Sequence, residues 1–179
     1  MRHPLRLLIL LALGLMLALA ATAEAGSSQR GGQMERIDHV ADGDTVDLTN
    51  GDRVRLVQID TPEVYFSREC YGEHASRITK RLLRPGTLVR LYAEPKTDAV
   101  DEYGRLLRYV FRVRDGLNVN VHLVQVGAAA PYFYDGRRGR YAGLLVRLGL
   151  RARRHHLGLW GRCPGTPWEP DHGVSTGPP

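Results

Sequence analysis

The chain has 179 residues, of which 43% are hydrophobic, and it carries a formal net charge of +6. This length suits one domain with a sizeable core, and the hydrophobic content is ordinary for a globular protein. Its two cysteines, Cys70 and Cys163, lack C-x-x-C partners, which argues against dithiol redox catalysis and against a cysteine zinc site. The basic balance favours polyanionic partners, although basicity by itself is a weak indicator.

Residues 1–23 have the three-part layout of a secretory signal peptide. Arg2 and Arg6 begin a short basic segment, an uncharged Leu- and Ala-rich run follows, and small residues fit cleavage after Ala23 or Ala25. An uncleaved membrane anchor is the alternative, but the uncharged run of 17 residues is shorter than the roughly 20 that cross a bilayer. Cleavage after residue 23 removes two arginines and no acid, so the charge of +6 becomes +4. We therefore expect a secreted or periplasmic protein with no stable membrane association after cleavage.

Export also decides how we interpret the two cysteines. In an oxidising compartment, a disulfide between Cys70 and Cys163 is more probable than two free thiols. Such a bond would close a loop of more than 90 residues and would stabilise the fold by about 4–5 kcal/mol by the chain-entropy argument. We expect this pair to be structural.

The composition at both ends of the mature chain predicts where the domain lies. Residues 24–33 are small and polar and predict a linker. Residues 164–179 hold five prolines and three glycines, which predicts a disordered tail. One domain then occupies residues 34–163.

Hydrophobic periodicity predicts strands in the first part of this domain and mostly helices in the second. We expect short strands over residues 34–40, 45–48, 53–59, 87–92 and 106–113. We expect helices over residues 72–83, 117–126 and 141–156, with an extended segment over residues 128–134. Asn50-Gly51 is a strong hairpin signal between the second and third strands. This pattern predicts an α+β fold, and a small closed barrel is an economical way to hide the strand edges.

Four acids, Asp42, Asp44, Asp60 and Glu63, lie within a short span at the expected strand ends. If these strands are neighbours, the carboxylates can converge on one hard cation, and calcium tolerates irregular sets of oxygen ligands. The alternative for residues 42–45 is a simple polar turn.

Residues 60–63, Asp-Thr-Pro-Glu, strengthen the metal-site interpretation. Pro62 stiffens the backbone where Asp60 ends its strand, and a loop carboxylate such as Glu63 can accept a proton from an attacking water. Arg55 lies five residues before Asp60, so a regular strand would point their side chains to opposite faces. A bulge or the end of the strand must bring them together.

Residues 101–105 predict a turn that places Arg105 at the start of a strand. Two guanidiniums, those of Arg55 and Arg105, together with a divalent cation would form the electrostatic clamp that phosphoryl transfer requires. Arginine suits this role because its planar fork binds phosphate bidentately and keeps its charge. Taken singly, either arginine is equally well explained as a solvated surface charge.

Four segments in a fixed order are more specific than any one of them. They are residues 42–46 (Asp-Gly-Asp-Thr-Val), 55–63 (Arg-Leu-x-x-Ile-Asp-Thr-Pro-Glu), 103–105 (Tyr-Gly-Arg) and 157–160 (Leu-x-Leu-Trp). In this order they resemble the staphylococcal nuclease (thermonuclease) family over about residues 36–162. The resemblance implies a five-stranded OB-fold barrel with three helices. Nothing in the sequence demands more than a monomer, so we expect one.

The resemblance also implies a role for each matching residue. Calcium would be bound by the Asp44 and Asp60 carboxylates and the Thr61 backbone carbonyl, with Asp42 in a supporting position. Glu63 would act through water as the general base, and Arg55 and Arg105 would stabilise the transition state. Substrate would be contacted by three tyrosines, Tyr103, Tyr132 and Tyr134. The implied reaction is hydrolysis of DNA and RNA, with single strands favoured, to products ending in 3′-phosphate.

The sequence also departs from the family pattern and leaves rival interpretations. Glu102 stands before Tyr103, where a cation would assist phosphate binding. A non-catalytic OB-fold module would bind nucleic acid without requiring the full set of acids and arginines. A calcium-binding structural protein of the envelope would leave the arginines and tyrosines unexplained. His155 and His156 are adjacent on a helix and point about 100° apart, which argues against a zinc site.

Overall fold

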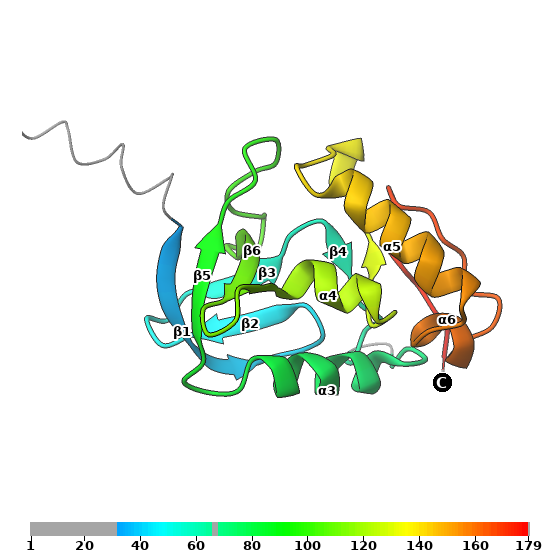
Figure 1. The fold of residues 1–179 in the computed structure, drawn as a ribbon, viewed down its shortest axis with the longest axis horizontal. Helices are drawn as coiled ribbons and strands as arrows, with labels where there is room; N and C mark the ends of the chain where they lie inside the picture. Colours follow the sequence, from blue (N-terminus) through cyan, green and yellow to red (C-terminus); the bar gives the residue numbers. More distant parts are fainter. Residues whose placement is uncertain (1–31, 66–67, 179) are drawn as a thin grey trace, which may run out of the picture. The chain divides into compact units, whose positions relative to one another are not determined.

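Five strands of the computed structural model form a closed mixed barrel (Figure 1). They are β1 (Gln33–Val40), β2 (Thr45–Leu48), β3 (Arg53–Leu56), β5 (Leu88–Tyr92) and β6 (Leu106–Arg112). Their hydrogen-bonded order is β3-β2-β1-β5-β6, and β3 also pairs with β6 in parallel, with Val54 opposite Leu106. This pairing joins the two ends of the sheet, so the barrel hides the strand edges. The predicted α+β class and OB-like barrel are confirmed.

The structure describes residues 32–65 and 68–178. The signal peptide expected over residues 1–23 and nearly all of the linker expected over residues 24–33 lie outside the described residues. Within the described ranges, no helix is long and apolar enough to cross a membrane.

The strand expected over residues 53–59 is in fact two strands, and this break positions the site. β3 ends at Leu56, a turn follows, and β4 (Ile59–Asp60) pairs with β8 (Ala130–Pro131) in a separate two-stranded sheet. Gln58 takes a left-handed backbone conformation with φ of 67°. The turn ends the strict alternation of side chains, which lets Asp60 meet Arg55 despite their opposite parity.

Three longer helices pack around the barrel, as expected (Figure 1). They are α3 (Gly72–Leu82), α4 (Val119–Gln125) and α5 (Ala142–Arg154). Two shorter elements, the 3-10 turn η1 (Tyr134–Gly136) and the helix α6 (Leu159–Arg162), come before and after α5. The helix expected from residue 117 begins only at Val119, because the Asn118 side chain caps it by accepting from the Val121 amide at 3.2 Å. The two residues before it form the strand β7 (Leu117–Asn118).

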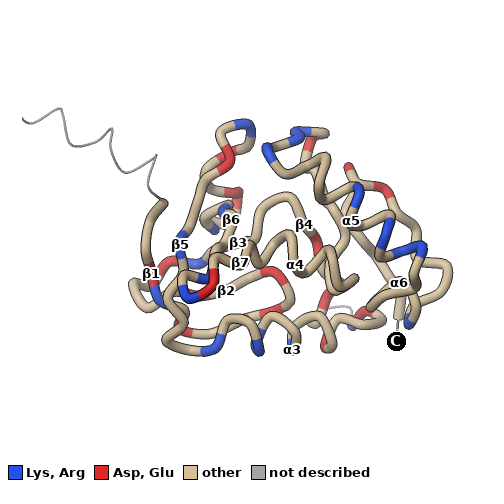
Figure 2. The backbone as a smooth tube through the Cα atoms, viewed as in Figure 1, with Lys and Arg blue, Asp and Glu red and all other residues tan. Residues whose placement is uncertain are grey.

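The core lies inside the barrel and under α4 and α5. Fully buried apolar side chains come from both strands and helices, among them Ile37, Val54, Leu91, Leu123 and Leu145. Each such side chain stabilises the fold by roughly 1.5–3 kcal/mol when it is removed from water. Four arginines of α5 are exposed, Arg147, Arg151, Arg153 and Arg154, and Figure 2 shows basic positions along this helix.

The C-terminal segment differs from the disorder that its composition predicts. In the structure it packs on the domain, where Val174 is only 7% exposed and the Trp168 ring lies edge-on to Trp160 with centroids 6.4 Å apart. The Pro170 carbonyl accepts from the Phe133 amide at 2.6 Å. Two apolar anchors in an otherwise polar stretch therefore hold a segment whose prolines and glycines favour disorder.

Candidate active site

A buried cluster of two carboxylates and one guanidinium lies where β2, β3 and β4 meet. Arg55 Nη1 lies 2.9 Å from Asp44 Oδ2, and Arg55 Nη2 lies 2.6 Å from Asp60 Oδ1. Arg55 Nη1 also donates to the Ile59 carbonyl at 2.9 Å. The Arg55 side chain is only 14% exposed. The turn at Gln58 thus brings together the three residues that the sequence predicted for one site.

The Asp44 carboxylate is fixed by neighbours on both sides. Its Oδ2 accepts from both the amide and the hydroxyl of Thr61, each at 2.9 Å, and the Thr45 hydroxyl lies 3.2 Å from its Oδ1. Asp42 Oδ1 accepts from the amides of Asp44 and Thr45 at 3.0 and 2.7 Å. Residues 42–45 therefore form the simple polar turn that was the alternative to a metal site. This turn also places the Asp44 carboxylate in the cluster.

Gly43 permits this approach of two distant segments. A Cβ at this position would lie 2.5 Å from Thr61 Oγ1, which is closer than real contacts allow. The Gly43 carbonyl accepts from the Thr79 hydroxyl on α3 at 2.6 Å. The sequence motif contains this glycine, but only the fold shows that it leaves room for Thr61.

In this cluster two largely buried carboxyls face one guanidinium. Burial raises the pKa of Asp44 to about 7; the Arg55 charge opposes this shift, and Asp42 and Asp60 add to it. Burial likewise raises the pKa of Asp60, against the opposing effects of Arg55 and of a hydrogen bond from the Val174 amide. Buried carboxylates are stabilised in the ionised form by a nearby cation, so this cluster favours a further positive charge.

Asp44 and Asp60 could hold a hard cation only together with backbone and water oxygens. Among the described residues, no three His, Cys, Asp or Glu side chains gather closely enough to hold a metal ion by themselves. Asp44 and Asp60 provide carboxylate oxygens, and the adjoining Thr61 has a backbone carbonyl. Calcium accepts such mixed sets of carboxylate, carbonyl and water oxygens.

Glu63 lies on the loop that follows β4, with an exposed side chain. Although the side chain is exposed, neighbouring protein atoms displace part of its hydration; this effect, and then the charges of Asp42 and Asp60, raise the pKa of its carboxyl. Its amide donates to Glu69 Oε2 at 3.0 Å. The charges of the cluster therefore act on the Glu63 carboxyl. The hydrogen bond to Glu69 joins the Glu63 backbone to its own loop.

A cavity of about 450 Å³ opens beside Arg55. The predicted catalytic and substrate-contacting residues in its lining are Arg55, Tyr103, Arg105, Tyr132 and Tyr134. The rings of Tyr132 and Tyr134 meet edge to face with centroids 6.4 Å apart. Arg55 is therefore shared by the carboxylate cluster and the cavity.

The second predicted arginine is oriented by an acid on its own turn. Arg105 Nε lies 2.7 Å from Asp101 Oδ2, and its amide donates to Asp101 Oδ1 at 2.9 Å. The Arg105 guanidinium lies over the Tyr103 ring at 5.2 Å from its centroid. Tyr103 itself is 74% exposed, so its ring is open to a ligand at the cavity mouth.

Two residues of the cavity wall were not found from the sequence. Gln58 donates to the Arg137 carbonyl at 2.7 Å and accepts from the Gly139 amide at 2.8 Å, which fixes the loop after η1. Arg137 also lines the cavity and pairs with Asp98 at 3.1 Å. A buried glutamine inside an apolar strand pattern was the only sequence signal for this arrangement.

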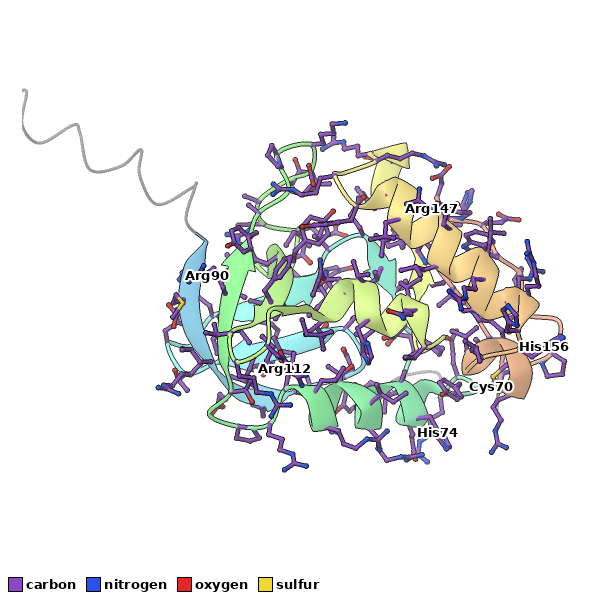
Figure 3. All side chains as sticks on the ribbon, in the orientation of Figure 1. Cys70, His74, Arg90, Arg112, Arg147 and His156 are labelled. Atoms are coloured by element: carbon purple, nitrogen blue, oxygen red, sulfur yellow. A yellow bond between two sulfur atoms is a disulfide. The ribbon has the colours of Figure 1, made fainter. Side chains whose placement is uncertain are left out.

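The predicted disulfide is present and joins the ends of two helices. Cys70, just before α3, is bonded to Cys163 at the end of α6 (Figure 3). His156, also labelled in Figure 3, is exposed beyond the end of α5, as is His155. The disulfide therefore ties the loop that carries Glu63 to the C-terminal part of the domain.

Most of the domain matches a known family. A family model described as "Staphylococcal nuclease homologue" matches residues 53–162, which is more than half of the chain. The chain belongs to the staphylococcal nuclease homologue family, as the sequence resemblance predicted.

Several relatives carry names that refer to nucleases. Endonuclease YncB of Bacillus subtilis is 40% identical over 132 residues, which cover 70% of this chain and 61% of that protein. Thermonuclease of Staphylococcus intermedius is 32% identical over 137 residues, covering 73% of this chain and 78% of that protein. The SPbeta prophage-derived endonuclease YokF of Bacillus subtilis is 34% identical, but the match spans only 43% of its length.

Proposed function

We propose that this protein is an exported, calcium-dependent nuclease that hydrolyses DNA and RNA to products ending in 3′-phosphate. The observation that carries the proposal is the position of Arg55, which pairs with Asp44 and Asp60 and also lines the tyrosine-bearing cavity. A phosphate in this cavity would face Arg55 and Arg105 while remaining next to the carboxylate cluster. The names of the relatives support the same class of reaction.

The two arginines provide the binding and the electrostatic stabilisation. Each guanidinium offers planar donors that suit the nonbridging oxygens of a phosphodiester. Because Asp101 orients Arg105 and two carboxylates orient Arg55, both donors are held before substrate arrives. Preorganised donors of this kind stabilise the charge that develops in the transition state.

Calcium would be held by the Asp44 and Asp60 carboxylates and the Thr61 carbonyl, and when bound it would supply positive charge at the phosphate. Glu63 would accept the proton of the attacking water, because its carboxylate lies on an exposed loop beside the cluster. General-base catalysis of this kind contributes about 10²–10⁴-fold to the rate.

The aromatic side chains favour single-stranded substrate. Tyr103 would contact a neighbouring phosphate, while Tyr132 and Tyr134 would lie beside the base and sugar. Unpaired bases expose the faces that stack on tyrosines, whereas a duplex hides them. The signal layout and the disulfide support export to the medium or periplasm, and we propose that the protein acts there as a monomer.

Cleavage of single-stranded DNA and RNA with calcium, with magnesium and with chelator tests the proposal. We expect calcium-dependent cleavage that falls by about 10²–10⁴-fold in Glu63→Gln. Glu73→Gln, which neutralises an exposed glutamate on α3, is the matched control and should cut normally. Tight binding without cleavage under any metal would instead identify a non-catalytic binding module.

A further inference from the structure

The segment of residues 169–177, which we call the C-terminal strap, lies outside the region that the family model matches. The strap follows Cys163 in the sequence and is the red end of the chain in Figure 1. The Cys70 amide donates to the Gly177 carbonyl at 2.8 Å, and the Thr176 hydroxyl donates to the Cys70 carbonyl at 2.7 Å. The strap is therefore bonded to the loop that carries Glu63.

The middle of the strap contacts the carboxylate cluster directly. The Val174 amide donates to Asp60 Oδ2 at 2.8 Å, while Asp60 Oδ1 lies 2.6 Å from Arg55. Each oxygen of the Asp60 carboxylate thus accepts one hydrogen bond, Oδ1 from the Arg55 guanidinium and Oδ2 from the Val174 amide. A hydrogen bond from a neutral donor to a carboxylate is charge-assisted, so it restricts the orientation of the acceptor strongly.

Gly173 shows that this contact is closely fitted. Its φ is +78°, and a Cβ at this position would lie 2.7 Å from Asp60 Oδ2 and 3.7 Å from the Tyr132 ring. A residue with a side chain would be strained in this conformation and would also push against the carboxylate. The backbone of the strap passes Asp60 at a distance that only glycine permits.

The strap leaves Asp60 able to bind a cation. A carboxylate has about four lone-pair sites on two oxygens, and each Asp60 oxygen accepts one of the two bonds just described. One site on each oxygen remains for a metal ion. The hydrogen bond from Val174 therefore orients the Asp60 carboxylate without using all of its lone-pair sites.

We propose that the C-terminal strap is a positioning element of the nuclease site, in which the Val174 amide holds the Asp60 carboxylate in the orientation that binds calcium. This proposal rests on the proposed function, since it concerns the same cation. Partners that orient a metal ligand in this way commonly change metal affinity by about 10- to 100-fold.

Calcium titration calorimetry and the calcium dependence of cleavage test the proposal on four variants. Val174→Pro removes the amide hydrogen, whereas Val174→Ala keeps it and removes the side chain. Gly173→Ala pushes a Cβ toward Asp60. Gly165→Ala, which lies before the strap, carries the same kind of backbone strain, with φ of +83°, but its Cβ would meet nothing within 4 Å. Circular dichroism and thermal melting monitor folding throughout.

We expect Val174→Pro and Gly173→Ala to bind calcium about 10- to 100-fold more weakly and to regain cleavage at high calcium. Gly165→Ala should keep the calcium affinity of the unaltered chain. Val174→Ala, which keeps the amide, should lose less calcium affinity than Val174→Pro and should melt earlier. If Val174→Pro does not fold, Gly173→Ala carries the test, because its Cβ would displace the neighbouring backbone from Asp60. Unchanged calcium affinity in Val174→Pro and Gly173→Ala would overturn the strap proposal alone. An unaltered chain that neither binds calcium nor cuts would overturn the proposed function as well.

Discussion

At the scale of single residues, Arg55 has two tasks that normally compete. Its guanidinium neutralises buried carboxylates, and it also lines the cavity in which a phosphate would bind. A buried cation held by two acids is oriented at little entropic cost when the ligand arrives. The same residue would lose much of its attraction for phosphate if those acids kept its charge fully compensated. The calcium ion that we propose would relieve this conflict, because it would compensate the two acids in place of Arg55.

The role that we propose for Arg105 predicts that lysine cannot replace it. Arg105→Lys keeps the positive charge but loses the planar fork and the Nε contact to Asp101. We expect kcat to fall by about 10²–10³-fold, as when a preorganised donor to the transition state is removed. Steady-state kinetics on single-stranded DNA measure this change. Arg90→Lys on an exposed part of β5 is the matched control, and equal activity of the two variants would contradict the assignment.

Gly43 predicts a coupled loss of stability and activity. In Gly43→Ala the new methyl group would lie 2.5 Å from Thr61 Oγ1, so either the turn or Thr61 must move. Overpacking of this kind costs about 1–3 kcal/mol, and the displaced Asp44 should weaken catalysis. Denaturant unfolding and cleavage assays check both effects. Gly143→Ala on α5, where the nearest atom would be 3.6 Å away, should instead leave activity unchanged.

At the scale of elements, the cavity depends on two loops that the barrel does not itself connect. Glu94 follows β5, and its buried carboxylate accepts from the amide and Nε of Arg140 at 2.8 and 3.3 Å. Gln58 holds the same loop from the other side through the Gly139 amide. These buried polar contacts place the segment after η1, and with it the wall of the cavity.

Glu94 predicts a stability difference that depends on pH. Burial alone would raise the pKa of Glu94, but hydrogen bonds from the Arg140 and Lys96 amides and the Arg140 side chain outweigh it, so the pKa is lower than usual. The ionised form therefore stabilises the fold above the unfolded-state pKa of about 4.3, and this contribution disappears as pH falls through the folded-state pKa.

We expect Glu94→Gln to lose about 1–3 kcal/mol of unfolding free energy at neutral pH, with a smaller difference in acid. Urea unfolding at several pH values measures it. Asp98→Asn, whose partner Arg137 is also exposed, should cost less than about 1 kcal/mol. A Glu94→Gln penalty that grew in acid would contradict the sign of this argument.

The elements show which parts of the site can be predicted from sequence. The strands and helices follow hydrophobic patterns that are local, and the acids and arginines stand in motifs whose order is specific. The break between β3 and β4 is different, because Gln58 adopts a positive φ that its own residue type does not favour. Tertiary hydrogen bonds to residues 79 and 81 positions away hold it. The packing of Val174 on Asp60, 114 positions apart, is equally invisible to local reasoning.

At the scale of the whole domain, one covalent bond connects the parts that surround the cluster. Cys70 and Cys163 are 93 positions apart. Cys70 also exchanges hydrogen bonds with the strap. The bond therefore limits how far the Glu63 loop, α6 and the strap can separate. Cross-linking distant segments stabilises a fold chiefly by restricting the unfolded chain.

Replacing both cysteines tests this arrangement. Cys70→Ala with Cys163→Ala should lower the free energy of unfolding by about 2–5 kcal/mol, and differential scanning calorimetry would record the lower melting temperature. Reductant should lower the melting temperature of the unaltered protein in the same way and leave the double variant unchanged. Because Asp44, Arg55 and Asp60 contact one another without the disulfide, cleavage well below the melting temperature should persist in the variant. If the loss of the disulfide loosens the strap, calcium affinity should weaken while activity at saturating calcium stays the same. A loss of activity at saturating calcium would show instead that the disulfide shapes the cluster of Asp44, Arg55 and Asp60 itself.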